Sequence, residues 1–248
     1  MKNYKLKIEE IIEYFGYNNP FSSQELYQFY CNFEGSLNKG TFRWRVYYLK
    51  ENGIIRSLKR GTYILEERKI YAPTVSLSLK RLFNNVKREF PYLDISIWDT
   101  SWLHDFMNHQ PFSSITILEV DKEAVESAFN FLRQIKSNVF LKPTSEEVEN
   151  YILNENVIVI VPIIKESPII ENNKVRVPKI EKILVDLYAE KELLSSYQGQ
   201  EMINIFERIY KYYSINATTL YRYARNRGIK ERLLNFITRD TNIDRNYI

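Results

Sequence analysis

The sequence has little of the chemistry that most metal and redox sites require, with one cysteine and two histidines among 248 residues. Because Cys31 stands alone, an internal disulfide and a cysteine metal site are excluded. His104 and His109 occupy positions i and i+5, a spacing that does not place both on one face of a helix. The sequence therefore predicts no metal site and no cofactor.

Glycine-rich loops and long apolar runs are missing as well. The seven glycines are scattered, which excludes a glycine-rich loop that binds phosphate. The most apolar run, 157–164, is far too short to span a bilayer. The first residues, MKNYKLKIEEIIEYF, are charged throughout and lack the apolar centre of a signal peptide. We expect a cytoplasmic protein that does not contact a membrane.

Positive charge is modest overall but concentrated in two stretches. The formal net charge is +4, which does not by itself indicate nucleic-acid binding. Residues 36–65 contain seven basic residues and one acidic residue, and residues 216–239 contain six basic residues and one acidic residue. These two stretches are the first candidates for contact with a polyanion or an acidic partner.

The N-terminal residues follow the order of a winged helix-turn-helix. Hydrophobic periodicity, a serine before the second helix and Gly53 after the third predict three short helices and then two strands, at 5–15, 21–30, 39–51, 54–57 and 62–65. A tight basic turn joins the two strands. We predict a winged helix-turn-helix over residues 1–68.

Beyond residue 68 the pattern changes twice. Strands are predicted at 94–98, 113–120, 138–141 and 156–162, alternating with helices at 77–90, 101–107, 122–135 and 145–152. This alternation predicts a small α/β middle domain over residues 69–177. From Pro178 the pattern is helical, at 178–190, 199–213, 217–228 and 230–240. The overall prediction is a mixed α/β fold whose C-terminal part, residues 178–248, is helical.

The third helix combines a core face with an unusual outer face. At 100° per residue, Phe42, Val46 and Leu49 lie on one side. Arginines lie among aromatic residues on the other side, and arginine binds guanine edges and phosphates while aromatic rings contact thymine methyl groups and sugars. The residues predicted to bind DNA, including the basic turn of the hairpin, are Lys39, Thr41, Arg43, Trp44, Arg45, Tyr47, Lys50, Lys59 and Arg60.

Two other functions remain open for the chain. The winged helix would instead serve as a protein-docking module if Trp44 and Tyr47 pack against a partner. A second alternative is a Mg²⁺-dependent nuclease centred on Asp94 and Glu119. That chemistry also needs a lysine two residues after the glutamate, where Asp121 stands instead, and Lys122 points to the other face of a strand. Asp121 and Glu119 are expected to close the strand and cap the next helix, and an enzyme is not predicted.

The second basic stretch, INATTLYRYARNRGIKERL (215–233), allows several interpretations. Helical spacing turns Leu220 and Ala224 inward, and Arg222, Arg225 and Lys230 outward. The outward residues would contact DNA, bind an acidic partner, or form a solvated surface in which arginines lie on tyrosines.

Three further segments carry a resemblance to a known family. The runs VRVPKIEKILVDLYAEKEL (175–193) and INATTLYRYARNRGIKERLLNFI (215–237) follow the N-terminal winged-helix pattern. Together with ISIWDTSWLHDFMNHQPFSSITILEVDKEAVESAFNFL (95–132), they resemble the AbiEi-type antitoxins of abortive-infection, type IV toxin–antitoxin systems. The likeness covers most of the chain in the same order.

The resemblance implies a function without enzymatic activity. The N-terminal domain would bind inverted repeats of operator DNA upstream of its own operon and repress that operon. The C-terminal part would neutralise a nucleotidyltransferase toxin, and a stable complex of the two proteins is not required. The basic surface of that C-terminal part corresponds here to Arg222, Arg225, Arg227, Lys230 and Arg232.

Overall fold

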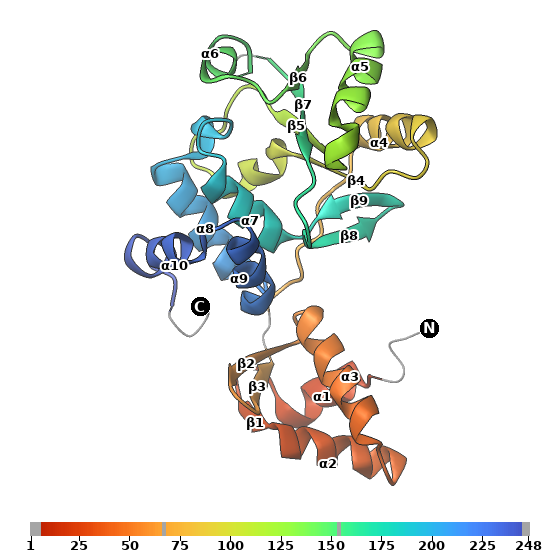
Figure 1. Cartoon of the computed structure of the whole chain (residues 1–248). Coiled ribbons are helices and arrows are strands. Elements are labelled where there is room, and N and C mark those ends of the chain that lie inside the picture. Colours follow the sequence, from red (N-terminus) through yellow and green to blue (C-terminus); the bar gives the residue numbers. More distant parts are fainter. Residues whose placement is uncertain (1–5, 66–67, 153–154, 245–248) are drawn as a thin grey trace. The chain divides into compact units, whose positions relative to one another are not determined.

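A computed structural model describes residues 6–65, 68–152 and 155–244 of the chain. The described residues divide into two compact units (Figure 1). The smaller unit contains the residues up to Ile70 together with Tyr210–Asn216, and the larger contains Tyr71–Ile209 and the described residues from Ala217 onward.

The described part of the smaller unit contains helices packed against a three-stranded antiparallel sheet of order β1-β3-β2. Its core is formed by residues such as Leu26, Phe29 and Leu49. Ser22 and Glu25 form the predicted capping box, in which each side chain bonds the backbone amide of the other residue. The elements are α1 (Ile8–Phe15), β1 (Pro20–Ser22), α2 (Ser23–Glu34), α3 (Lys39–Glu51), β2 (Ile55–Lys59) and β3 (Thr62–Leu65).

The larger unit begins with a region of alternating helices and strands and continues with helices. The first region contains α4 (Leu77–Glu89), β4 (Ile95–Asp99), a 3₁₀ helix (Thr100–Phe106), β5 (Ile115–Val120), α5 (Val125–Ile135), β6 (Val139–Leu141), α6 (Ser145–Glu147), β7 (Val157–Pro162), β8 (Ile169–Asn172) and β9 (Val175–Pro178). The helices that follow are α7 (Ile180–Ala189), α8 (Gln200–Tyr212), α9 (Ala217–Asn226) and α10 (Lys230–Arg239); the last three residues of α8 belong to the smaller unit.

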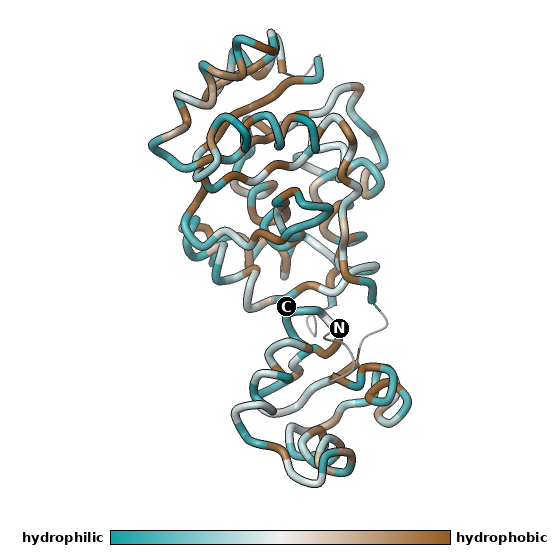
Figure 2. Tube along the Cα trace, turned by 90° about the vertical axis from the view of Figure 1, so that its right-hand side faces the viewer, coloured by the Kyte–Doolittle hydropathy of each residue, from teal (hydrophilic) through white to brown (hydrophobic). Residues whose placement is uncertain are grey.

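A four-stranded sheet of order β4-β5-β7-β6 organises the larger unit. β4 is antiparallel to β5, while β5, β7 and β6 are parallel. One face carries Leu118 and Ile160, which join a core formed with residues of α4 and α5. Because side chains alternate along a strand, Glu119 points to the opposite face, where α7 lies. Hydrophobic stretches run through the interior of this unit, and hydrophilic stretches are common in its loops (Figure 2).

The structure confirms the mixed α/β class and the helical C-terminal part. The winged helix-turn-helix stays a prediction, as do the boundaries after residues 68 and 177. The region predicted as a middle domain and most of the C-terminal helices belong to one compact unit. None of the helices in the described part of the chain has the length and hydrophobicity that crossing a membrane requires.

Candidate functional site

The outer face of α3 carries several of the residues predicted to contact DNA. The helix begins after Asn38, whose side chain accepts a hydrogen bond from the Gly40 amide. Phe42, Val46 and Leu49 pack into the core of the smaller unit, as predicted. The side chains on the outer face are exposed to solvent: Lys39, Thr41, Arg43, Trp44 and Tyr47.

The aromatic residues on this face are exposed to an unusual degree. Trp44 is 46% exposed and Tyr47 is 62% exposed, although the Trp44 ring also lies 5.5 Å from the Tyr48 ring, between centroids. Within the described residues, no hydrogen bond or ion pair engages the guanidinium of Arg43 or the ammonium of Lys39. The face therefore presents two free cations beside two partly open rings.

Arg45 does not belong to this face, which corrects its predicted role in binding DNA. It is only 4% exposed, and its guanidinium lies 2.8 Å from a carboxylate oxygen of Glu34 and 4.5 Å from the centre of the Tyr30 ring. It stands three residues after Phe42 and four before Leu49, so it lies within the apolar stripe of α3. Arg45 therefore joins α3 to α2.

The turn of the β2–β3 hairpin carries the other predicted DNA contacts. Lys59 and Arg60 are exposed, and Gly61 takes a φ of 76°, a left-handed conformation that glycine adopts without strain. Among the described residues, neither cationic head group has an ion-pair partner. Lys50, near the end of α3, is half-buried.

The second basic set divides into exposed residues and one that lies inward. Arg222, Arg225 and Arg232 are exposed. Lys230 is half-buried, with its ammonium 3.6 Å from the Glu231 carboxylate. Arg227 is half-buried too, and its guanidinium binds two carboxylates, so it does not extend the exposed basic surface as predicted.

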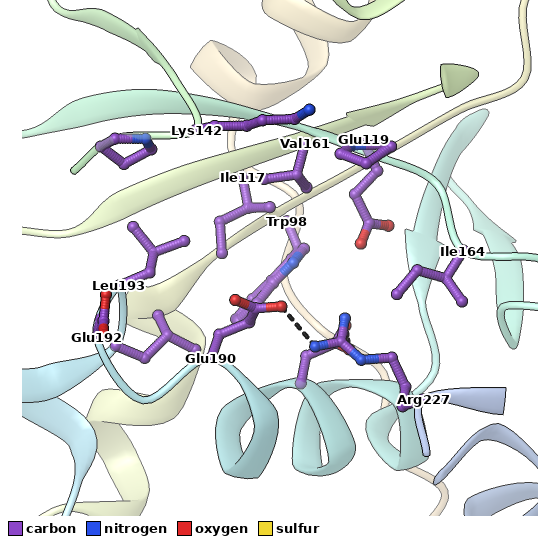
Figure 3. Close-up of a pocket in the computed structure, with 14 residues that line it drawn as sticks. Trp98, Ile117, Glu119, Lys142, Val161, Ile164, Glu190, Glu192, Leu193 and Arg227 are labelled. Atoms are coloured by element: carbon purple, nitrogen blue, oxygen red, sulfur yellow. Dashed lines mark hydrogen bonds and ion pairs between the residues drawn. The ribbon is translucent and has the colours of Figure 1, made fainter. Parts of the chain in front are cut away.

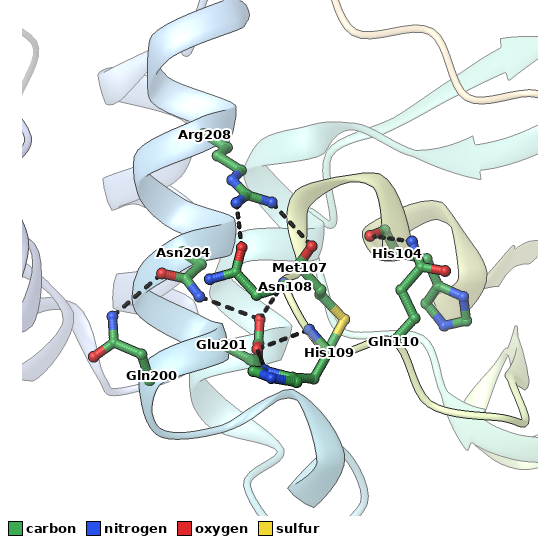
Figure 4. A network of polar contacts seen from close by, with 9 residues as sticks. All are labelled: His104, Met107, Asn108, His109, Gln110, Gln200, Glu201, Asn204 and Arg208. Atoms are coloured by element: carbon green, nitrogen blue, oxygen red, sulfur yellow. Dashed lines mark hydrogen bonds and ion pairs between the residues drawn. The ribbon is translucent and has the colours of Figure 1, made fainter.

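The two histidines take part in separate structural contacts. His104 forms a 3.1 Å hydrogen bond with the Tyr197 hydroxyl, and His109 forms a 2.8 Å bond with Glu201 on α8. Glu201 also accepts the backbone amide of Asn108 (Figure 4). Although burial raises the pKa of Glu201, these hydrogen bonds outweigh it and lower that pKa to about 2. The network therefore fixes the loop after the 3₁₀ helix to α8.

The carboxylates of the nuclease alternative have different surroundings. Asp94 is exposed and its carboxylate lies 2.5 Å from Arg176. Asp121 accepts the Asp94 amide and makes no capping bond to the following helical turn, where a cap was expected. Glu119 is buried and caps no helix, contrary to the prediction. Within the described residues, no group of three histidine, cysteine or acidic side chains is placed to hold a metal ion.

A buried lysine that the sequence did not predict at this site contacts Glu119. Lys182, in the first turn of α7, is completely buried and bonds Glu119 Oε1 and, at 2.5 Å, Asp186 Oδ2. Asp186 also accepts a 2.9 Å hydrogen bond from the Tyr223 hydroxyl and lies 3.4 Å from Arg227. Two carboxylates therefore share one buried ammonium.

The charges of this cluster stabilise one another. Burial lowers the pKa of Lys182, but Asp186 and Glu119 outweigh it and raise that pKa above its ordinary value. Burial raises the pKa of Glu119 above its ordinary value, and Lys182 offsets only part of that rise. Lys182 therefore keeps its proton at neutral pH, so it cannot serve as a general base.

A cavity of about 340 Å³ lies beside this cluster, against the face of the sheet that carries Glu119 (Figure 3). Its apolar walls include Trp98, Ile117 and Val161, and its polar groups include Glu119 and Arg227. Glu119 extends from the sheet toward the side on which Glu190 and Arg227 lie.

Comparison with known proteins assigns the chain to a family but gives no activity for that family. The family described as "Family of unknown function (DUF6577)" matches residues 41–243, which include most of α3, the hairpin and nearly all of the larger unit. No curated protein matches the sequence.

Proposed function

We propose that this chain, which belongs to the family of unknown function (DUF6577), is a winged-helix DNA-binding antitoxin and autorepressor of a type IV toxin–antitoxin operon. In this proposal α3 is the recognition helix in the major groove, and the β2–β3 turn is the wing along the phosphate backbone. The toxin partner is a nucleotidyltransferase, and no stable complex with it is needed.

The outer face of α3 is the observation that supports DNA binding most directly. Arg43 and Lys39 are exposed without partners among the described residues, and Trp44 and Tyr47 stand beside them. Exposing two large aromatic rings to solvent does not stabilise the fold. In a groove of DNA the same rings would contact sugars and thymine methyl groups. Free guanidinium and ammonium groups match the guanine edges and phosphates beside those sites.

The wing supports the same proposal. Lys59 and Arg60 stand at the turn with no ion pair to the described part of the chain, so their charge is available to phosphates. Gly61 allows the tight turn that brings both side chains to its tip.

Direct measurement of DNA binding tests this half of the proposal. The full chain would be titrated against labelled DNA from immediately upstream of its own gene, by gel shift and fluorescence anisotropy at several salt concentrations. We expect Arg43→Ala to weaken binding by about 1–3 kcal/mol if the residue reads a base. Arg81→Ala, an exposed arginine on α4, serves as the matched control.

Substitutions in the proposed wing and in the proposed recognition helix should affect DNA binding in different ways. Lys59→Ala should weaken all DNA sequences alike and reduce the salt slope by about one. If both Arg43→Ala and Lys59→Ala bound DNA with wild-type affinity, this surface would not be the DNA-binding surface. Trp44 fluorescence that responds to an added protein and never to DNA would favour the docking module instead.

The antitoxin half of the proposal rests on the resemblance and on the exposed arginines of α9 and α10. Deletion of residues 178–248 would remove Lys182 and leave Glu119 unpaired, so it would test folding rather than antitoxin function. We therefore choose charge reversal of Arg222, Arg225 and Arg232, which are all exposed. Loss of growth rescue against the adjacent nucleotidyltransferase is expected. Failure of the wild-type chain to rescue would refute this half alone.

The nuclease remains the weaker alternative. Lys182 does reach Glu119, but it is held between two carboxylates and keeps its proton. Asp94, the other predicted metal ligand, is bound to Arg176. Mg²⁺-dependent DNA cleavage that disappears in Glu119→Ala would revive this alternative.

A further inference from the structure

The cavity beside Glu119 has the size and composition of a small-molecule site. Its volume of about 340 Å³ lies at the lower end of the range for ligand pockets, which is roughly 300–1,000 Å³. Trp98, Ile117, Val161 and Leu193 give it largely apolar walls. Such a cavity with a few polar groups suits a small organic molecule better than a bare ion.

The charges that face the cavity favour a cationic occupant. The carboxylates of Glu119, Asp186 and Glu190 all line it. Arg227 lines it as well, but its guanidinium is already bound to Glu190 at 2.5 Å and to Asp186 at 3.4 Å. Lys142 and Glu192, also in the lining, are both exposed and have opposite signs. Lys182 is bound to Glu119 and Asp186 from outside the lining, so three carboxylates are balanced by two cations and one negative charge remains in excess.

One of these carboxylates has an oxygen without a hydrogen-bond donor among the described residues. Glu119 is 4% exposed, Lys182 occupies its Oε1, and its Oε2 has no hydrogen-bond partner in the described part of the chain. Ser96, the cross-strand neighbour of Glu119, is also buried; its hydroxyl lies close enough to lower the pKa of that carboxyl but makes no hydrogen bond of normal geometry in the described part of the chain. A buried carboxylate oxygen without a donor is costly, and a ligand with N–H groups would remove that cost.

We propose that this cavity binds a small organic cation whose planar edge carries N–H donors, such as an amidinium, a guanidinium or a protonated amino-heterocycle. An N–H group of the donor edge would bond the Glu119 carboxylate from the cavity side, because a hydrogen bond between a cation and a carboxylate is charge-assisted. The apolar body would pack on Trp98 and Val161, and the indole ring would also attract the positive charge. This inference is independent of the proposed DNA binding.

Calorimetric titration of the full chain with benzamidine tests the proposal, since that probe combines an amidinium edge with an apolar ring. Benzoate, which has the same shape and the opposite charge, is the control ligand. We expect saturable 1:1 binding of benzamidine, with a dissociation constant of roughly 10 mM or tighter for a ligand of this size. Benzoate should give no binding heat.

Two variants and a control variant test whether benzamidine binds in this cavity. Glu119→Gln keeps the shape of the side chain and an acceptor for Lys182 but removes the negative charge, and we expect it to weaken benzamidine binding by about tenfold or more. Ile164→Trp narrows the cavity and leaves Glu119 intact, so it should also abolish binding. Ile163→Trp changes the neighbouring residue, which is not in the cavity lining, and should bind normally.

Three outcomes would overturn the proposal. The first is no heat with the wild-type chain up to about 20 mM benzamidine. The second is unchanged affinity in Glu119→Gln, and the third is unchanged affinity in Ile164→Trp. Circular dichroism of each variant establishes that it is folded, and Ile164→Trp keeps the test decisive if Glu119→Gln does not fold.

Discussion

Replacement of Lys182 by methionine tests the buried cluster in the larger unit. Lys182 is completely buried and its ammonium is shared by Glu119 and Asp186. Methionine has a similar length and fills the same volume, so the change removes the charge with little loss of packing. Two buried carboxylates are then left without their main counterion.

The size of the effect follows from this arrangement. Removing one partner of a buried ion pair costs about 3–5 kcal/mol, because the remaining charge is desolvated without compensation. Arg227, 3.4 Å from Asp186, and the Tyr223 hydroxyl, 2.9 Å from it, still stabilise that carboxylate. Most of the loss therefore arises at Glu119, and we expect a decrease of about 3 kcal/mol in the free energy of unfolding at pH 7.

The loss should also depend on pH. Lys182 has a raised pKa, so in the wild type its contribution is fully present below the ordinary lysine pKa and constant between pH 5 and pH 8. In Lys182→Met, Glu119 has no counterion, so burial raises its pKa in the folded state further. The variant then gains stability as the pH falls from 7 toward 5, by up to about 1.4 kcal/mol per pH unit.

Urea denaturation at pH 5 and pH 7, followed by circular dichroism, measures both effects. Lys80→Met, a half-buried lysine on α4, is the matched control and should change stability by less than about 0.5 kcal/mol. Adding Glu119→Leu to Lys182→Met should recover stability, because the uncompensated carboxylate is then gone. A loss below about 1 kcal/mol, or an equal loss at both pH values, would refute this reasoning.

Three smaller changes test other contacts by the same denaturation assay. Arg45→Ala should lower stability by about 1–2 kcal/mol, since it removes a buried side chain and the partner of Glu34, and should leave the salt slope of DNA binding unchanged. Glu201→Gln should lower the free energy of unfolding by on the order of 1–3 kcal/mol above pH 4.5. This difference from the wild type should disappear as the pH falls toward 2, where the wild-type carboxylate becomes protonated. Gly53→Ala should cost about 1–3 kcal/mol, because the φ of 63° disfavours alanine and the new Cβ would lie 2.8 Å from Ser214.

Local periodicity was enough to predict most helices and strands. The third helix was predicted at 39–51, which is α3, and the buried strand at 156–162 differs from β7 by one residue. These segments are long enough for the spacing of apolar residues to be distinct. β1 has only three residues and depends on its pairing with β3, more than thirty-five positions away, so no local pattern predicted it.

The candidate site was predicted only where exposure follows from helical spacing. The outward positions of Arg43, Trp44 and Tyr47 on α3 were predicted correctly. The prediction for Arg45 is wrong because a charged side chain is usually exposed, whereas the spacing of Arg45 from Phe42 and Leu49 places it on the buried side of α3.

The contact between Lys182 and Glu119 could not be predicted, because it joins residues far apart in the chain. One signal was present nonetheless. Lys182 and Asp186 stand four residues apart in a helix whose other residues are mostly apolar, so both charges lie on a helix that must be buried. Such a pair within an apolar helix indicates an internal ion pair, but it gives no sign that Glu119 of β5 also joins it.

Burial of arginines and lysines also limits how strongly the smaller unit can bind DNA. Arg45 is internal, so the exposed cations of α3 and the β2–β3 turn that have no ion-pair partner among the described residues are Lys39, Arg43, Lys59 and Arg60. If all of these bind phosphates, the logarithm of the binding constant should fall with the logarithm of salt at a slope near −3.6 per copy, and near −2.7 if Arg43 reads a base instead. A slope of about zero would contradict binding through this face. A slope well beyond −4 per copy would require further basic residues, and the exposed Arg222, Arg225 and Arg232 would then be the next to replace.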